Sequence, residues 1–205
     1  MSQPVHIGLV GMGTVGTGVV RVLKDSAHHI AKQAGRPLLV KHVVVKNVKK
    51  PRSVELTEKQ LSNDLAKITE DQTISVVAVL LGGLEPARTI CLELLRSGKD
   101  LVTANKALLA EHGPELFQAA REAGRSIAFE AAIGGGIPIV AAISECLTGN
   151  QISSIRGILN GTSNFILTKM EQEGSNYHDV LALAQSEGYA EADPTMDVDG
   201  TDATQ

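Results

Sequence analysis

VHIGLVGMGTVG, the stretch Val5–Gly16, is an aliphatic run that leads into three closely spaced glycines. Gly11, Gly13 and Gly16 match the pattern G-x-G-x-x-G, directly after a predicted strand and before a predicted helix. In that pattern the first glycine permits a tight turn, the second lets the backbone approach a pyrophosphate, and the third lets the helix pack on the strand. The N–H groups at the start of the helix have no partner within the helix and can donate hydrogen bonds to a phosphate. The stretch predicts a dinucleotide site; the alternative is a turn that only joins strand to helix.

The composition indicates a soluble globular chain with an aliphatic core. Of 205 residues, 43% are hydrophobic but only 2% are aromatic, which suits a buried parallel sheet and argues against stacking of single-stranded nucleic acid. No apolar stretch reaches the ~20 residues needed to cross a bilayer, and no signal peptide precedes the first strand. We therefore expect a cytoplasmic protein with no membrane or nucleic-acid partner. Cys91 and Cys146 lie in apolar helical patterns and are expected to be small buried residues in a reducing compartment.

Aliphatic runs alternate with amphipathic segments through most of the chain. We predict strands at 4–10, 38–46, 74–81, 100–104 and 126–131, and helices at 14–30, 57–67, 86–97, 114–123 and 137–148. Pro86, Pro114 and Pro138 fall near the predicted helix starts, where the missing N–H is harmless. This order implies the α/β class, with a Rossmann-like, doubly wound parallel sheet.

The pattern changes at the glycines 134–136. After them we predict a strand at 152–159, a turn at Asn160-Gly161 and helices at 162–173 and 176–187, which is typical of the beginning of an α+β substrate domain. We therefore place a dinucleotide-binding domain at 1–133, and a hinge with an incomplete substrate and dimerisation domain at 134–205. Residues 170–205 carry nine of the 23 acidic residues and none of the 19 Lys and Arg residues, so this segment suits a cationic ligand.

The end of the second predicted strand bears on the choice of cofactor. An acid there usually binds the ribose 2′-hydroxyl of NAD, whereas this chain has Lys46, followed by Lys49, Lys50 and Arg52. These cations suit the 2′-phosphate of NADP. The alternative is a solvated basic loop, and the sequence leaves NAD against NADP open.

Two further strand ends place polar groups at the edge of the sheet where ligands bind in such folds. Gly82 follows the third predicted strand, and Thr103, Asn105 and Lys106 stand at the end of the fourth. We expect Asn105 and Lys106 to project into the crevice beside a nicotinamide, where a lysine can orient a carbonyl oxygen or transfer a proton. An isolated lysine is more often a surface residue, so spacing alone indicates no more than an NAD(P)-dependent oxidoreductase.

Five motifs occur in order along the chain: GMGTVG at 11–16, VTANKA at 102–107, EAAIGGGIP at 130–138, GILNGTSNFILTKM at 157–170 and GYAEADP at 188–194. Together they closely resemble homoserine dehydrogenase, and the resemblance spans essentially the whole chain. It implies reversible hydride transfer between NADP (or NAD) and a small-molecule substrate. In that reaction L-aspartate 4-semialdehyde and L-homoserine are interconverted, on the route to threonine, methionine and isoleucine.

The resemblance also implies roles for single residues. Lys106 and Asp197 match active-site residues, while Glu191 and Asp202 match carboxylates that hold the substrate. Charge agrees with this, because a substrate ammonium needs carboxylates. Gly188 matches a cofactor contact. The predicted cofactor contacts are thus Gly11, Met12, Gly13, Thr14, Val15, Gly16, Lys46, Gly82, Thr103, Asn105, Lys106 and Gly188.

The segment 130–137 matches a sodium site in the family. The implied ligands are oxygen atoms of Glu130, Ile133, Gly135 and Ile137. Hard cations prefer oxygen, and a glycine-rich bend can aim several carbonyls inward. A hinge of small residues between domains is the other interpretation, and both can hold at once.

The chain departs from the family in length. Family members continue beyond 205 residues, and the second catalytic lysine of the family would stand immediately after Gln205. We therefore expect a truncated piece with weak or no turnover, since general acid catalysis contributes about 10²–10⁴ in rate. Missing strands would expose apolar surface and a sheet edge, so we also expect a homo-oligomer.

Two other functions stay open. The first is a non-catalytic nucleotide-binding module or sensor, against which the intact VTANK and GYAEADP motifs argue. The second is a different, acylating semialdehyde dehydrogenase, which needs a catalytic cysteine at the crevice. Neither Cys91 nor Cys146 lies at the carboxyl end of a predicted strand, so this function is the weaker of the two.

Overall fold

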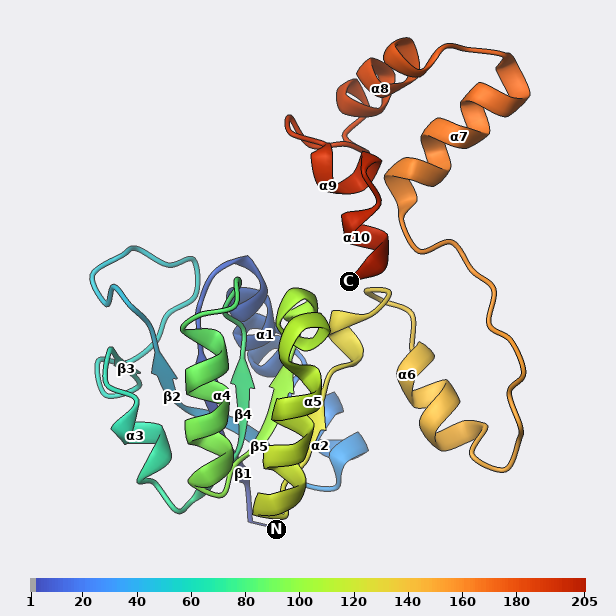
Figure 1. Cartoon of the computed structure of the whole chain (residues 1–205). Helices are drawn as coiled ribbons and strands as arrows, with labels where there is room; N and C mark the ends of the chain where they lie inside the picture. Colours follow the sequence, from blue (N-terminus) through green and yellow to red (C-terminus); the bar gives the residue numbers. More distant parts are fainter. Residues whose placement is uncertain (1–2) are drawn as a thin grey trace. The chain divides into compact units, whose positions relative to one another are not determined.

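The computed structural model describes residues 3–205 (Figure 1). Within these residues six parallel strands form one sheet in the order β3-β2-β1-β4-β5-β6. The strands are β1 Val5–Val10, β2 Leu38–Val44, β3 Leu61–Ser62, β4 Ile74–Val79, β5 Asp100–Thr103 and β6 Ile127–Ala128. The helices between them are α1 Thr14–Asp25, α2 Ala27–Ala34, α3 Ala66–Thr69, α4 Ala87–Arg96 and α5 Lys106–Ala123. The predicted Rossmann-like α/β fold is confirmed.

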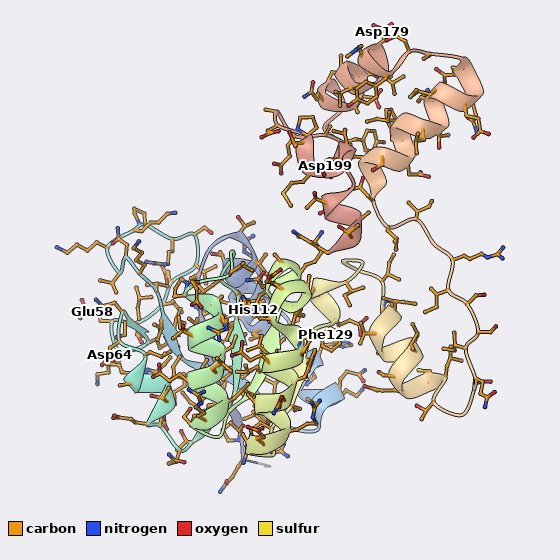
Figure 2. All side chains as sticks on the ribbon, in the orientation of Figure 1. Glu58, Asp64, His112, Phe129, Asp179 and Asp199 are labelled. Atoms are coloured by element: carbon orange, nitrogen blue, oxygen red, sulfur yellow. The ribbon has the colours of Figure 1, made fainter. Side chains whose placement is uncertain are left out.

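One edge of the sheet is formed by β3, which has two residues. Exposed charged side chains flank it, among them Glu58 and Asp64 (Figure 2). A very short strand beside charged groups is a poor template for pairing with another chain. This edge is therefore protected against further strand addition.

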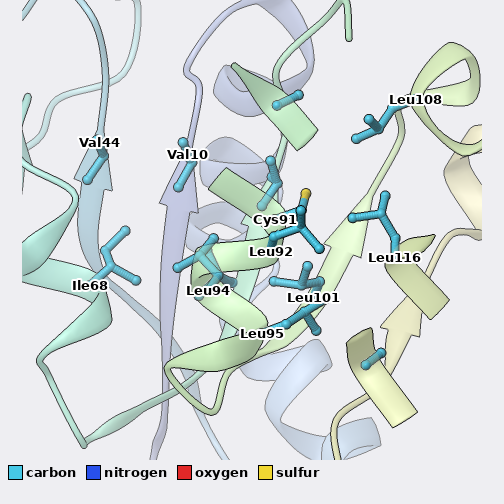
Figure 3. Packing of buried hydrophobic residues seen from close by; sticks show 14 of the residues in the cluster. Val10, Val44, Ile68, Cys91, Leu92, Leu94, Leu95, Leu101, Leu108 and Leu116 are labelled. Atoms are coloured by element: carbon cyan, nitrogen blue, oxygen red, sulfur yellow. The ribbon is translucent and has the colours of Figure 1, made fainter. Parts of the chain in front are cut away.

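Aliphatic side chains cover the sheet on both faces. One cluster joins α4 and α5 to the sheet and includes Leu94 and Leu116, each at most 1% exposed (Figure 3). A second cluster holds α1 on the opposite face through Val20. Neighbours along one strand, such as Val77 and Ala78, fall in different clusters because successive side chains point to opposite faces.

The carboxyl ends of the strands are level with one another. Val10 pairs with Val44 on one side and with Val79 on the other, and Val79 pairs with Thr103. The loops that follow β1, β2, β4 and β5 therefore meet at one edge of the sheet, which is where ligands bind in this kind of fold.

Three predicted helices have wrong bounds. The helix predicted at 14–30 is interrupted at Ser26 and resumes as α2. The segment predicted as a helix at 57–67 is a turn and the strand β3, followed by α3. Pro114 lies inside α5, because the Asn105 side chain accepts a hydrogen bond from the Leu108 N–H (3.0 Å) and starts the helix eight residues before the predicted position.

Pro86 and Pro138 stand just before α4 and α6, as predicted. The helix α6, Ile139–Ala141, continues as one turn of π-helix, Ala142–Cys146. The chain then divides into two compact units, which we call the first unit (through Cys146) and the second unit (147–205). The domain boundary that we predicted after residue 133 stays a prediction.

The second unit is helical. It contains α7 Gly161–Glu173, α8 Tyr177–Ser186, α9 Thr195–Val198 and α10 Thr201–Thr204, and α7 and α8 confirm two predicted helices. The strand predicted at 152–159 is wrong, because no strand within residues 3–205 pairs with this segment and isolated strands are not stable in water. Among the helices of the described chain, none combines the length and the apolar character needed to traverse a bilayer.

Candidate active site

The glycine turn after β1 is held by the neighbouring strands. The Gly11 N–H donates to the Val44 carbonyl (2.9 Å), and Gly11 has a φ of 92°, which favours glycine. A β-carbon at Gly11 would lie 2.8 Å from the Leu80 carbonyl oxygen, and one at Gly16 would lie 2.3 Å from the Gly11 carbonyl oxygen. A β-carbon at Gly13 would meet no atom within 4 Å. Packing therefore requires the first and third glycines, whereas the second leaves open space that suits a ligand.

The first turn of α1 suits an anion. Gly13 is the N-cap and supplies no side-chain hydrogen bond, and no acid stands in the first turn. Thr14 and Val15 are exposed, and Met12 is half-buried. The N–H groups at a helix start attract phosphate, and the helix dipole adds to that attraction. The turn thus has the arrangement expected of a pyrophosphate site.

The loop after β2 is basic, but its cations divide into two kinds. The Arg52 guanidinium is folded back and donates to the carbonyls of residues 47, 48 and 50, at 2.7, 3.2 and 2.7 Å. Lys46, Lys49 and Lys50 are exposed. Arg52 therefore shapes the loop, and the three lysines are the groups that can meet an anionic ligand. The sequence alone does not separate Arg52, which binds its own loop, from the three exposed lysines.

Asn105 joins the loops after β4 and β5. Its Nδ2 donates to the carbonyls of Leu81 (3.0 Å) and Gly83 (2.6 Å), while its Oδ1 caps α5. Because the residue is 8% exposed and its amide is engaged, the side chain does not project into a crevice as we expected. Thr103 is also buried, and its hydroxyl donates to the Val79 carbonyl (3.1 Å). Both residues hold the loops, and contact with a cofactor stays a prediction.

Two further predicted residues stand at the same edge of the sheet. Lys106 is the first residue of α5 and is half-buried. Gly82 lies in the loop after β4, and a β-carbon there would meet no atom within 4 Å. Their position at the carboxyl edge is compatible with the predicted roles in binding and catalysis.

The segment after β6 bends at two glycines, Gly134 and Gly136, whose φ angles are 56° and 85°. The two carboxylate oxygens of Glu130 accept hydrogen bonds from the start of α6, at 2.9 Å from Val140 N and 2.8 Å from Ala141 N. The carboxylate of Glu130 therefore acts as a helix cap. This leaves main-chain oxygens as the better candidates for a cation in this segment.

Those main-chain oxygens are partly engaged. The Glu130 carbonyl accepts from Ile133 N (3.3 Å), and the Ile137 carbonyl accepts from Ile139 N (2.8 Å). Ile133, Gly135 and Ile137 are exposed. Within residues 3–205 no group of three or more His, Cys, Asp or Glu residues could hold a metal ion. A cation here would depend on carbonyl oxygens, each of which has a second lone pair.

The acids of the second unit are of two kinds. Asp179 and Asp199 lie on the surface (Figure 2). Asp197 and Asp202 are half-buried, and the Nδ2 of Asn160 donates to both, at 2.8 Å to Asp197 Oδ1 and 2.9 Å to Asp202 Oδ2. The structure thus brings together two of the acids that we predicted to act on the substrate.

Asn160 is the residue that sequence reasoning missed. We predicted a turn at Asn160-Gly161, whereas Asn160 is the N-cap of α7 and the link between the two acids. An asparagine directly before an amphipathic segment is a known signal for a helix start, so its capping role was open to prediction. Its bonds to the acids were not, because they span 37 and 42 residues.

Gly188 and Glu191 lie in the turn after α8, and both are exposed. The turn is anchored to α7: the Thr162 hydroxyl donates to the Tyr189 carbonyl (2.6 Å), and the rings of Phe165 and Tyr189 stack with centroids 4.7 Å apart. A hollow of about 290 Å³ opens beside these rings. The roles of Gly188 and Glu191 stay predictions.

Comparisons with known proteins show the family of this chain. Residues 11–130 match the family described as homoserine dehydrogenase, NAD binding domain, and residues 138–205 match homoserine dehydrogenase. The homoserine dehydrogenase of Synechocystis sp. is 49% identical over 203 residues, which cover 97% of this chain and 46% of that protein. The chain spans about half the length of the curated relatives it matches.

Solved structures are similar as well. A homoserine dehydrogenase from Thiobacillus denitrificans matches with a TM-score of 0.83 and 44% identity, over 98% of this chain and 46% of that one. A hyperthermophilic archaeal homoserine dehydrogenase in complex with NADPH matches with a TM-score of 0.79 and 26% identity, over 98% and 66%. The match to the NAD-binding domain of the family covers residues 11–130, which is more than half of this chain. The chain therefore belongs to the homoserine dehydrogenase family.

Proposed function

We propose that this chain supplies the dinucleotide site and part of the substrate site of an enzyme that interconverts L-homoserine and L-aspartate 4-semialdehyde. The observation that carries the proposal is the glycine turn. Glycine is required by packing at positions 11 and 16, while Gly13 leaves space beside the start of α1. This is the combination that a pyrophosphate needs.

We propose NADP as the preferred cofactor, with NAD as the alternative. Support comes from Lys46, Lys49 and Lys50, which are exposed in the loop where an acid would otherwise select the ribose hydroxyl of NAD. A 2′-phosphate would gain charge-assisted hydrogen bonds from such lysines. An NADPH complex of the archaeal relative is consistent with this choice.

The bound dinucleotide supplies the acceptor for a hydride. When homoserine is oxidised, its alcohol carbon loses that hydride and its hydroxyl group loses a proton, which leaves the aldehyde. We assign Lys106 and Asp197 to orienting the oxygen and transferring the proton. Glu191 and Asp202 are assigned to the substrate ammonium, for which carboxylates are the natural partners.

The test is the reduction of NADP⁺ by L-homoserine, followed by nicotinamide absorbance beside a separate measurement of NADPH binding. We expect at most weak turnover, which is faster with NADP⁺ than with NAD⁺. Lys106→Met should lower kcat by about 10²-fold or more, while the exposed Lys59→Met serves as the control. A folded protein that does not bind NADPH would overturn the proposal. Binding of NADPH without turnover would leave only the dinucleotide site, as in a catalytically incomplete piece or a non-catalytic nucleotide-binding module.

Four finer properties belong to the same proposal. They are a sodium ion held by oxygens of Glu130, Ile133, Gly135 and Ile137, a homo-oligomer, a cytoplasmic location, and a place in the synthesis of threonine, methionine and isoleucine. The exposed glycine-rich bend supports the first. Equal melting temperatures in sodium and choline chloride would argue against the sodium ion, and a monomer at every concentration in light scattering would argue against the oligomer.

A further inference from the structure

The side chain of Asn160 uses all of its polar groups. Its Oδ1 accepts from the Ser163 N–H (2.7 Å), and the Ser163 hydroxyl lies within hydrogen-bond distance of the same atom (2.6 Å). Its Nδ2 has two N–H groups, and these donate to Asp197 (2.8 Å) and Asp202 (2.9 Å). One amide therefore connects the start of α7 with one acid on α9 and another on α10.

This arrangement fixes two carboxylates at once. Both oxygens lie within hydrogen-bond distance of one nitrogen, so the two acids are held close together although their charges repel. The Ser163 hydroxyl also lies 3.0 Å from the Asp197 carbonyl, which ties the backbone of α9 to the same point. Since an amide carries no charge, Asn160 aligns the acids without adding a cation of its own.

Capping a helix does not require such bonds. Asn176 caps α8 in the same unit, and its Oδ1 accepts from the Asp179 N–H (3.1 Å) while its Nδ2 donates to the side chain of the same residue. All of these bonds are local. The amide of Asn160, in contrast, reaches acids that lie 37 and 42 residues further along the chain.

We propose that Asn160 is a positioning residue, which holds Asp197 and Asp202 in the orientation that receives the substrate. This rests on the proposed function, in which Asp202 binds the substrate ammonium and Asp197 takes part in proton transfer. The consequence is specific: loss of the amide donor should impair the substrate steps and leave cofactor binding as it is.

The test compares two replacements of Asn160 that both keep good N-capping groups, Asn160→Ser and Asn160→Asp. In Asn160→Ser the bridge is lost, and we expect kcat/KM for L-homoserine to fall by about 10- to 100-fold, the effect of losing hydrogen bonds to charged groups. NADPH affinity should stay within about twofold of the wild type, because the glycine turn lies in the first unit and the turn that carries Gly188 is anchored by Thr162, whose bond the variant keeps.

Asn160→Asp adds a readout that a purely structural role would not move. In this variant a third carboxylate beside Asp197 and Asp202 replaces the amide donor with a repelling anion. The decrease in kcat/KM at alkaline pH should therefore be larger than in Asn160→Ser. A carboxylate close to others takes up a shared proton more readily, which restores a donor. Part of the activity should therefore return as the pH is lowered, and the pH profile should shift to the acid side.

Asn176→Ser and Asn176→Asp are the matched controls, and we expect wild-type kinetics and pH profiles for both. Tyrosine fluorescence verifies that the second unit is folded in each variant; if Asn160→Ser is unfolded, the pH profile of Asn160→Asp decides. A wild-type protein that neither turns over L-homoserine nor binds it in the presence of NADPH would overturn the proposed function. If it binds L-homoserine without turnover, the affinity for L-homoserine replaces kcat/KM in the comparison of the variants. Turnover in the wild type together with unchanged kinetics in the Asn160 variants would overturn the positioning role alone.

Discussion

The two units differ in how completely each buries its own apolar side chains. In the first unit, helices cover both faces of a parallel sheet, and Leu9, Ile68 and Leu94 are 0% exposed. The buried cluster of the second unit within the described residues is small and comprises Ile166, Val180, Ala184 and Ala190. The first unit therefore contains within itself the packing that its strands require.

In the second unit, the apolar residues of 151–160 are left exposed. Ile155, Ile158 and Leu159 are 66%, 70% and 77% exposed. Their pattern predicted a strand, but a strand exists through hydrogen bonds to a neighbour, and no strand among residues 3–205 supplies them. A strand pattern thus leads to a strand only where the fold provides a partner, as it does throughout the first unit.

Truncation of a core side chain is expected to have the largest effect. Leu94→Ala removes a fully buried side chain between α4 and the sheet, and should lower the free energy of unfolding of the first unit by about 2–5 kcal/mol. Ile166→Ala removes as many carbons from the small cluster of the second unit. This change should lower the free energy of unfolding of the second unit by about 2 kcal/mol, because a small cluster can collapse around the gap.

Each unit has its own probe for this measurement. The chain has two tyrosines, Tyr177 and Tyr189, and no tryptophan, so tyrosine fluorescence reports on the second unit. Cys91 is buried in the first unit, where burial raises the pKa of its thiol to about 12, so its labelling reports opening of that core. Cys146 is exposed, so our expectation of a buried side chain is wrong for this residue. In a Cys146→Ser background, Leu94→Ala should advance Cys91 labelling in urea and leave the tyrosine transition in place. Equal shifts of both would contradict separate units.

The next effect concerns the glycine turn of the first unit. In Gly16→Ala the new β-carbon meets the Gly11 carbonyl oxygen, which belongs to the backbone and cannot turn away. We expect a loss of about 1–3 kcal/mol in stability and weaker NADPH binding by about tenfold or more. Gly18→Ala is the matched control in the same helix, where a β-carbon has open space, and it should be neutral or stabilise by about 0.5–1 kcal/mol. Equal affinities in the two variants would argue against the turn as the cofactor site.

The smallest effect is a dependence of stability on pH. Burial alone would raise the pKa of the Asp71 carboxyl, but hydrogen bonds from Lys41 and Thr73 outweigh it and hold this pKa well below its usual range. A lowered folded pKa stabilises the protein above the unfolded value, about 3.9, and the gain is lost as the pH falls through the folded value. Asp71→Asn should therefore reduce stability at neutral pH and flatten its decline below about pH 4.

Asp193 is the counterpart of Asp71 in the second unit. Hydrogen bonds from Thr195 lower the pKa of its carboxyl, with no lysine among the causes. Asp193→Asn should change the decline of stability at acid pH less than Asp71→Asn does. An acid limb that is the same in wild type and Asp71→Asn would refute the assignment to Asp71.

Prediction from the sequence succeeded where the signal is local. Four of the five long aliphatic or alternating patterns of the first unit became strands over most of their length, and the glycine turn kept its spacing and its place before α1. The pattern at 126–131 forms only the two-residue strand β6, because a 3-10 helix begins at Glu130. It failed at Pro114, because the cap at Asn105 overrides the proline signal, and at 57–67, where pairing with β2 makes Leu61–Ser62 a strand. The cap at Asn105 is a local signal that prediction overlooked, because its bond reaches only Leu108. The failure at 57–67 comes from strand pairing that a window of neighbouring residues does not contain.

The order of amino acids determined the α/β alternation, the glycine turn and the acidic composition of the last 36 residues, since each depends on residues within a few positions of one another. Only the tertiary structure decided that Asn105 holds the loop after β4 and that Asn160 joins Asp197 to Asp202. The reason is physical: periodicity and turn chemistry act along the chain, whereas a side-chain hydrogen bond across 22 to 42 residues exists only once the chain has folded and brought donor and acceptor together.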